Sequence, residues 1–116
     1  MYYQLTKPDK KIAKACIDKG VDAEFREGLE TSENILRDWR AGKFAGNKEA
    51  YHELFQAVHK KDKAISRRYD GLGGSRWLQA VAEIFGDGYI AKEDIAGFSD
   101  GARIAIEQWT RGLDDR

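Results

Sequence analysis

The sequence predicts an all-α protein, folded as a single-domain bundle of about five helices over residues 1–116. Two observations carry this prediction. Apolar residues recur at helical spacing in several stretches, most clearly over 47–69. Glycines and capping residues separate these stretches, and the chain contains only one proline. The charged fraction of 34% is expected when amphipathic helices expose polar faces to water.

The first helix is expected to follow a short apolar arm over 1–5. Thr6 has the side chain of an N-cap, and Gly20 is expected to end the helix after about Lys19. Cys16 lies on the apolar stripe of this helix. We expect a small buried hydrophobe there rather than a reactive thiol, because a reactive thiol needs exposure and a depressed pKa.

The second helix is expected over 22–41 and ends at Gly42, and the third spans about 47–69 and ends near Gly71. The connection between them is short, which predicts a long antiparallel helix 2–helix 3 hairpin. Each helix carries one apolar stripe, and we expect both stripes to face the core. Their members are Val21, Phe25, Leu29, Ser32, Leu36 and Trp39 in one helix, and Tyr51, Leu54, Phe55, Val58, Ile65 and Tyr69 in the other.

The C-terminal part predicts two further helices. Ser75 is expected to cap a helix over 75–85, and Ser99 to cap the last one over about 100–111. Between them, residues 92–97 have the composition of one short helical turn. Trp77 and Trp109 are expected in the core.

Composition excludes some function classes and favours others. Twenty basic and twenty acidic residues give a formal net charge of zero, so the chain lacks the field that steers proteins to nucleic acids or anionic membranes. No apolar run approaches the roughly 18 residues of a spanning helix. A single cysteine and an N-terminus without an apolar signal segment lead us to expect a cytoplasmic protein with no membrane association.

The glycine-rich segment after the third helix is the candidate partner-binding site. Glycines let backbone N–H groups approach an anion, and the start of a helix favours negative charge. We therefore expect an acidic partner to bind at Arg67, Arg68, Gly71, Gly73, Gly74, Ser75 and Arg76. Two purely structural explanations of these residues remain open. The glycine-rich segment can be an ordinary helix connection, and the two arginines can pair with acidic residues of the 22–41 helix.

A basic run within the 60–76 segment supports a second function class, a nucleic-acid-associated accessory protein. No recognition-helix or RNA-binding motif accompanies this run. A solvated helix face is the usual explanation of such a run. The residues are Lys60, Lys61, Lys63, Arg67 and Arg68.

A third class, a metal- or ligand-binding helical enzyme, rests on Glu49, His52 and His59. Glutamate and histidine three residues apart on a bundle helix can ligate a metal together, but di-metal bundles need a second such motif and this chain has none. The main prediction is a small non-enzymatic helical protein-interaction or adaptor domain with a protein partner. We expect no bound metal and no cofactor.

Overall fold

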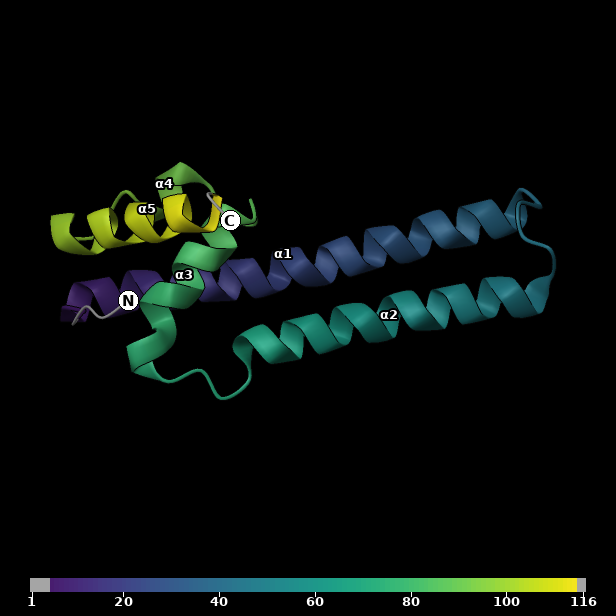
Figure 1. The fold of residues 1–116 in the computed structure, drawn as a ribbon, viewed down its shortest axis with the longest axis horizontal. Helices are drawn as coiled ribbons and strands as arrows, with labels where there is room; N and C mark the ends of the chain where they lie inside the picture. The colour runs from purple at the N-terminus through teal and green to yellow at the C-terminus, as the bar shows by residue number, and fades with distance from the viewer. Residues whose placement is uncertain (1–4, 115–116) are drawn as a thin grey trace. The chain divides into compact units, whose positions relative to one another are not determined.

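The computed structural model describes residues 5–114, and helices dominate these residues, with no strand among them (Figure 1). The all-α prediction is confirmed for this part of the chain. The expected N-terminal arm falls mostly on residues 1–4, outside the described residues, while Leu5 is buried. The elements are α1 (Lys7–Arg40), α2 (Asn47–Tyr69), the 3-10 turn η1 (Gly74–Arg76), α3 (Trp77–Gly86), α4 (Lys92–Ile95) and α5 (Asp100–Asp114).

Helix α1 corrects the prediction of two N-terminal helices. It runs without a break through Gly20 for 34 residues, so the expected helix over 22–41 is its C-terminal half. Ala13, Cys16 and Gly20 are all buried and follow one another at steps of three and four. Gly20 therefore occupies a packing position on the buried stripe instead of ending the helix. The predicted hairpin between two separate helices is not found in that form.

The ends of the two long helices agree with the sequence. The Asp9 amide donates to Thr6 Oγ1 at 3.2 Å, as expected if Thr6 caps α1. Gly42 after α1 and Gly71 after α2 have φ angles of 73° and 67°, a region that side chains with a Cβ rarely enter. Both glycines thus end their helices as predicted.

The C-terminal helices differ from the prediction at one end. Ser75 does not cap a helix, because it lies inside η1 and α3 begins at Trp77 without a side-chain cap. Ser99 directly precedes α5, the position expected of its cap, and its hydroxyl donates to Asp9; capping of α5 by Ser99 stays a prediction. Helix α4 fills most of the expected turn over 92–97.

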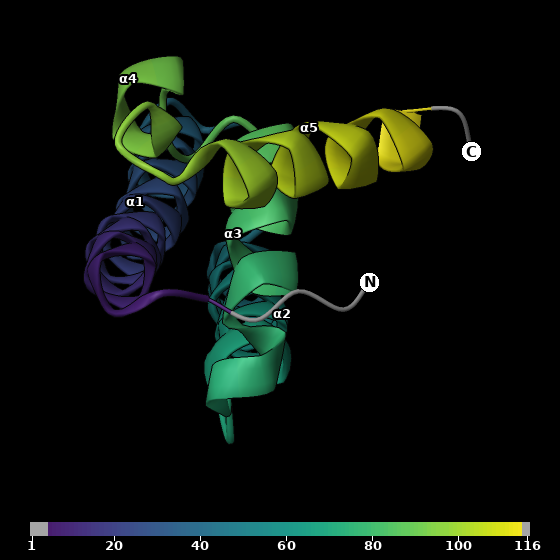
Figure 2. The same ribbon diagram turned by 90° about the vertical axis from the view of Figure 1, so that its left-hand side faces the viewer.

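The chain divides into two compact units, and α1 contributes to both. Unit 1 comprises Met1–Ala23 and Gly71–Arg116, and unit 2 comprises Glu24–Asp70. The expectation of a single domain over 1–116 stays a prediction. Within unit 1, α5 crosses α3, and the Thr110 hydroxyl donates to the Ala82 carbonyl at 3.3 Å (Figure 2). The core of unit 1 includes Ala13, Leu78, Val81, Ile84, Ile95, Ala102 and Ile106.

Unit 2 contains residues 24–40 of α1, the connection that follows and the whole of α2. The two helical segments lie side by side, and we call them the helix pair (Figure 1). Trp39 Nε1 donates to Asn47 Oδ1 at 2.9 Å near the connection, and Lys61 reaches Glu27 at 2.7 Å farther along. Only two apolar side chains of Glu24–Asp70, Ala50 and Ile65, are buried. The helix pair therefore has almost no core of its own.

Candidate functional site

The main feature of unit 2 is a row of large apolar side chains on its surface. Six of the seven exposed large hydrophobic residues in the described part of the chain belong to this unit, with exposed fractions between 46% and 71%. We call these six residues the apolar face: Phe25, Leu29, Leu36, Tyr51, Phe55 and Val58. The prediction that Phe55 and Val58 belong to the core is therefore wrong for the single chain.

Two hollows lie along the apolar face between α1 and α2. The one near the connection measures about 350 Å³, and the other about 200 Å³. The larger hollow is lined by Ile35, Leu36, Trp39, Asn47, Ala50, Tyr51 and Leu54. The smaller is lined by Phe25, Gly28, Leu29, Ser32, Val58, Lys61, Asp62 and Ile65.

The opposite side of the helix pair is polar. A groove there of about 570 Å³ is lined by Glu27, Gly28, Thr31, Glu53, Gln56, Ala57, Lys60, Lys61 and Ala64. Because successive helix positions are about 100° apart, Thr31 and Gln56 point away from the apolar face while their neighbours Ser32 and Phe55 lie toward it. The two sides of the same helices thus differ sharply in polarity.

The seam between the two helices explains why the apolar residues face outward. Glu24, Gly28 and Lys61 meet at this seam, and a methyl group placed on Gly28 would lie only 3.1 Å from Cγ of Lys61. A glycine on one helix and a lysine stem on the other bring the backbones close. Charged and small residues therefore occupy this part of the contact, and the apolar face lies beside it.

Glu24 is the buried centre of this seam. It is 3% exposed and lies 3.7 Å from Lys61 Nζ and 3.3 Å from Arg68 Nη1. Burial raises the pKa of the Tyr69 hydroxyl, and the neighbouring Glu24 carboxylate raises it further. Glu24 is not a member of the apolar stripe of its helix, so the hydrophobic periodicity alone does not predict its burial.

The predicted partner-binding site draws on both units. Arg67 is exposed at the end of α2, whereas Arg68 is only 20% exposed and pairs with Glu24, one of the alternatives left open above. In unit 1, the exposed residues of this set are Gly71, Gly73, Gly74 and Arg76. The side chain of Ser75 lies outside the described residues. Binding of an acidic partner at this set stays a prediction.

The metal-binding alternative involves three exposed residues of α2, Glu49, His52 and His59. The His59 ring stacks on Phe55 with 5.9 Å between ring centroids, which places it at the edge of the apolar face. Among the described residues, no group of three or more His, Cys, Asp or Glu side chains is placed to hold a metal ion. The described helices also include none long and apolar enough to cross a membrane.

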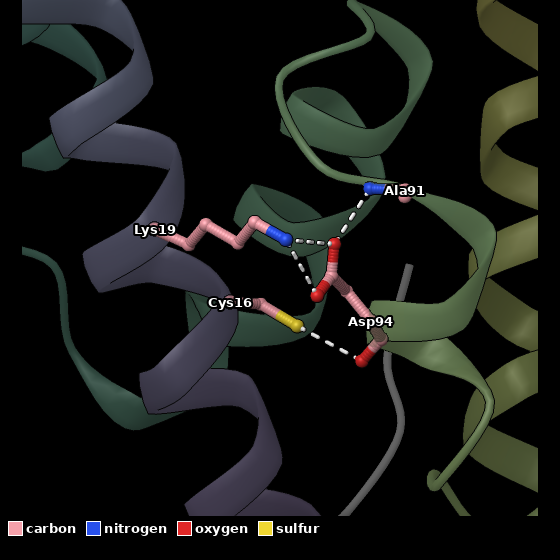
Figure 3. A network of polar contacts seen from close by, with 4 residues as sticks. All are labelled: Cys16, Lys19, Ala91 and Asp94. Carbon is pink, nitrogen blue, oxygen red and sulfur yellow. Dashed lines mark hydrogen bonds and ion pairs between the residues drawn. The ribbon is translucent and has the colours of Figure 1, made fainter.

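Polar contacts of unit 1 hold its own elements together. The Cys16 thiol donates to the Asp94 carbonyl at 3.4 Å, and Lys19 Nζ lies 2.9 Å from the Asp94 carboxylate (Figure 3). Burial raises the pKa of Cys16 to about 11, with a further contribution from the charge of Asp94. Cys16 is therefore a buried thiol in its protonated form, as the sequence predicts.

Comparison of the chain with protein-family models, with curated proteins and with solved structures finds no match. The apolar face is the feature that the sequence pattern identified but assigned to the wrong environment.

Proposed function

We propose that this chain is a non-enzymatic protein-interaction domain that binds a partner through the apolar face of unit 2. The observation that supports it most directly is the exposure of six large apolar side chains on one side of the helix pair. Soluble monomers rarely expose a contiguous apolar patch larger than a few hundred Å². A half-exposed aromatic side chain presents on the order of 100 Å². The same figure for the two leucines and the valine gives a face on the order of 600 Å², at the upper end of the roughly 300–600 Å² of the largest patch on a typical monomer, which is often functional.

In this proposal the helix pair is an antiparallel hairpin that binds its partner through the apolar face. Amphipathic helices gain most of their stability from burying an apolar face against another element. Ala50 and Ile65 are the only buried apolar residues of unit 2, so in this proposal a partner's surface supplies the missing layer. The hollows beside Leu36 and Val58 give a partner's side chains places to insert.

The charge of unit 2 favours an uncharged partner surface. Glu24–Asp70 contains ten Lys and Arg and nine Asp and Glu residues, a net charge of +1. Two members of the basic run, Lys61 and Arg68, pair with acidic residues of α1. These pairs weaken the case for nucleic-acid binding, which depends on unpaired positive charge.

A photo-crosslinking amino acid placed at positions along the helix pair tests this proposal in the organism that encodes the chain. Substitution at Phe55 or Leu29 is expected to give covalent protein adducts. Matched substitutions at Gln56 and Thr31, exposed positions next to the polar groove, serve as controls and are expected to give few. No adducts from the apolar face, or equal adducts from both sides, would refute the proposal.

A further inference from the structure

We infer that the partner seated on the apolar face is a second copy of this chain, so that two helix pairs close into a four-helix layer. This inference rests on the proposed function and names its partner. Its starting point is that the helix pair presents two parallel rows of large side chains. One row is Phe25, Leu29 and Leu36 on α1, and the other is Tyr51, Phe55 and Val58 on α2.

Each copy has both the hollows and the large apolar side chains that can fill the hollows of another copy. An occupant of the two hollows must supply large apolar side chains spaced along helices, and the rows of a second copy meet this requirement. The smaller hollow has Gly28 and Ser32 among its lining residues and measures about 200 Å³, which suits one large side chain. Phe55, at 61% exposure, is available to fill such a hollow in the other copy. In an isologous dimer each such contact is made twice.

The area is close to what a stable dimer requires. A standard interface buries about 800 Å² on each partner. The apolar face presents on the order of 600 Å², and partly exposed lining residues such as Ile35 and Trp39 extend it. Two copies together therefore exceed the roughly 1,000 Å² expected of a biological interface.

Charge does not oppose this pairing. The whole chain has a formal net charge of zero, so two copies have no net repulsion to overcome. The outer edges of the face carry both signs, with Arg26 and Glu33 on α1 and Lys48 on α2. The charged residues among the lining of the two hollows are Lys61 and Asp62, both in the smaller one, and they carry opposite signs.

Sedimentation equilibrium of the full chain tests the dimer. The wild-type chain is expected to give twice its 13.2 kDa mass with a Kd on the order of 1 μM or tighter. Phe55→Glu and Leu29→Glu are each expected to raise that Kd by at least about 30-fold, the loss typical of an interface hot spot. Both residues are exposed in the single chain, so the variants should keep their helical circular dichroism.

Matched controls carry the same charge change on the polar side. Gln56→Glu and Thr31→Glu should leave the Kd within about threefold of wild type, since they lie beside the apolar-face positions but point away from them. A wild-type chain that stays at 13.2 kDa up to millimolar concentration would overturn the dimer. Equal dissociation by all four variants would do so as well.

The two proposals fail in different ways. A monomeric chain that still forms adducts of another mass from position 55, and not from 56, removes the second copy as partner and keeps the interaction domain. A monomeric chain with no adducts from the apolar face removes both. A dimer in solution whose in-cell adducts have the mass of two copies supports both.

Discussion

Asp9 is the residue that ties the first turn of α1 to the start of α5 within unit 1. Its carboxylate is 1% exposed and accepts hydrogen bonds from the Ser99 amide at 2.8 Å and the Ser99 hydroxyl at 2.7 Å. We expect Asp9→Asn to lower the free energy of unfolding by about 1.5–3 kcal/mol, the range for hydrogen bonds to a charged group. Urea denaturation measures this loss. Asp18→Asn, an exposed position on the same helix, should change it by less than about 0.5 kcal/mol.

The Asp9 carboxylate also makes the free energy of unfolding depend on pH in the acidic range. Burial alone would raise the pKa of Asp9, but hydrogen bonds from Ser99 and Thr6 together hold it below its usual 3.8. Because the folded state then binds the proton more weakly than the unfolded state, the contribution is present above pH 3.8 and is lost as the pH falls through the lower folded pKa. The stability difference between wild type and Asp9→Asn should therefore shrink in that acidic range. A difference that grows as the pH falls there would contradict this assignment.

Glu24 has the corresponding role in unit 2. Its side chain is 4% exposed between Lys61 and Arg68, so removing it takes a buried counter-charge away from both cations, although Lys61 keeps its ion pair with Glu27. Glu24→Ala is expected to cost about 3 kcal/mol, as in other broken buried ion pairs. Glu33→Ala is the control, because Glu33 is 72% exposed in its pair with Arg37 and should cost less than about 1 kcal/mol. Similar losses in chemical denaturation for both variants would show that the Glu24 cluster is not buried in solution.

At the scale of elements, α1 shows how a local signal is overridden by packing. Glycine costs about 1 kcal/mol in a helix interior, and Gly20 therefore reads as a helix end. Its burial in step with Ala13 and Cys16 places it instead in the contact face of one long helix. We predict helical Cα chemical shifts without interruption from residue 18 to 22. Non-helical shifts at Gly20 or Val21 would restore the two-helix interpretation.

The sequence predicted helices well where caps and periodicity agree, as at Thr6, Gly42 and Gly71. It failed where neighbours decide the outcome. The stripes through Phe25 and Phe55 were recognised, but periodicity says only that a helix has an apolar face and not what covers it. The signal that the apolar rows lie outside the helix–helix contact came from the residues of the seam, Glu24, Gly28 and Lys61. Charged and small residues there leave the apolar rows exposed.

At the scale of the whole molecule, the two units differ in how they bury apolar surface. Ile106 is fully buried in unit 1, whereas Phe55 is 61% exposed in unit 2. At a concentration well below the Kd of the proposed dimer, Ile106→Ala should cost about 2–5 kcal/mol and Phe55→Ala less than about 1 kcal/mol. Tryptophan fluorescence in urea measures both. A large loss for Phe55→Ala under these conditions would mean that the single chain buries this residue.

The most direct test of the dimer through the apolar face is the measurement of intermolecular NOEs from a mixture of labelled and unlabelled copies of the full chain, at a concentration well above the expected Kd. The methyl signals of Leu29, Leu36 and Val58 should show NOEs to aromatic protons of the other copy. The methyl signals of Leu78 and Val81, buried in unit 1, should show none. The absence of intermolecular NOEs at all five residues, or intermolecular NOEs confined to Leu78 and Val81, would contradict the account.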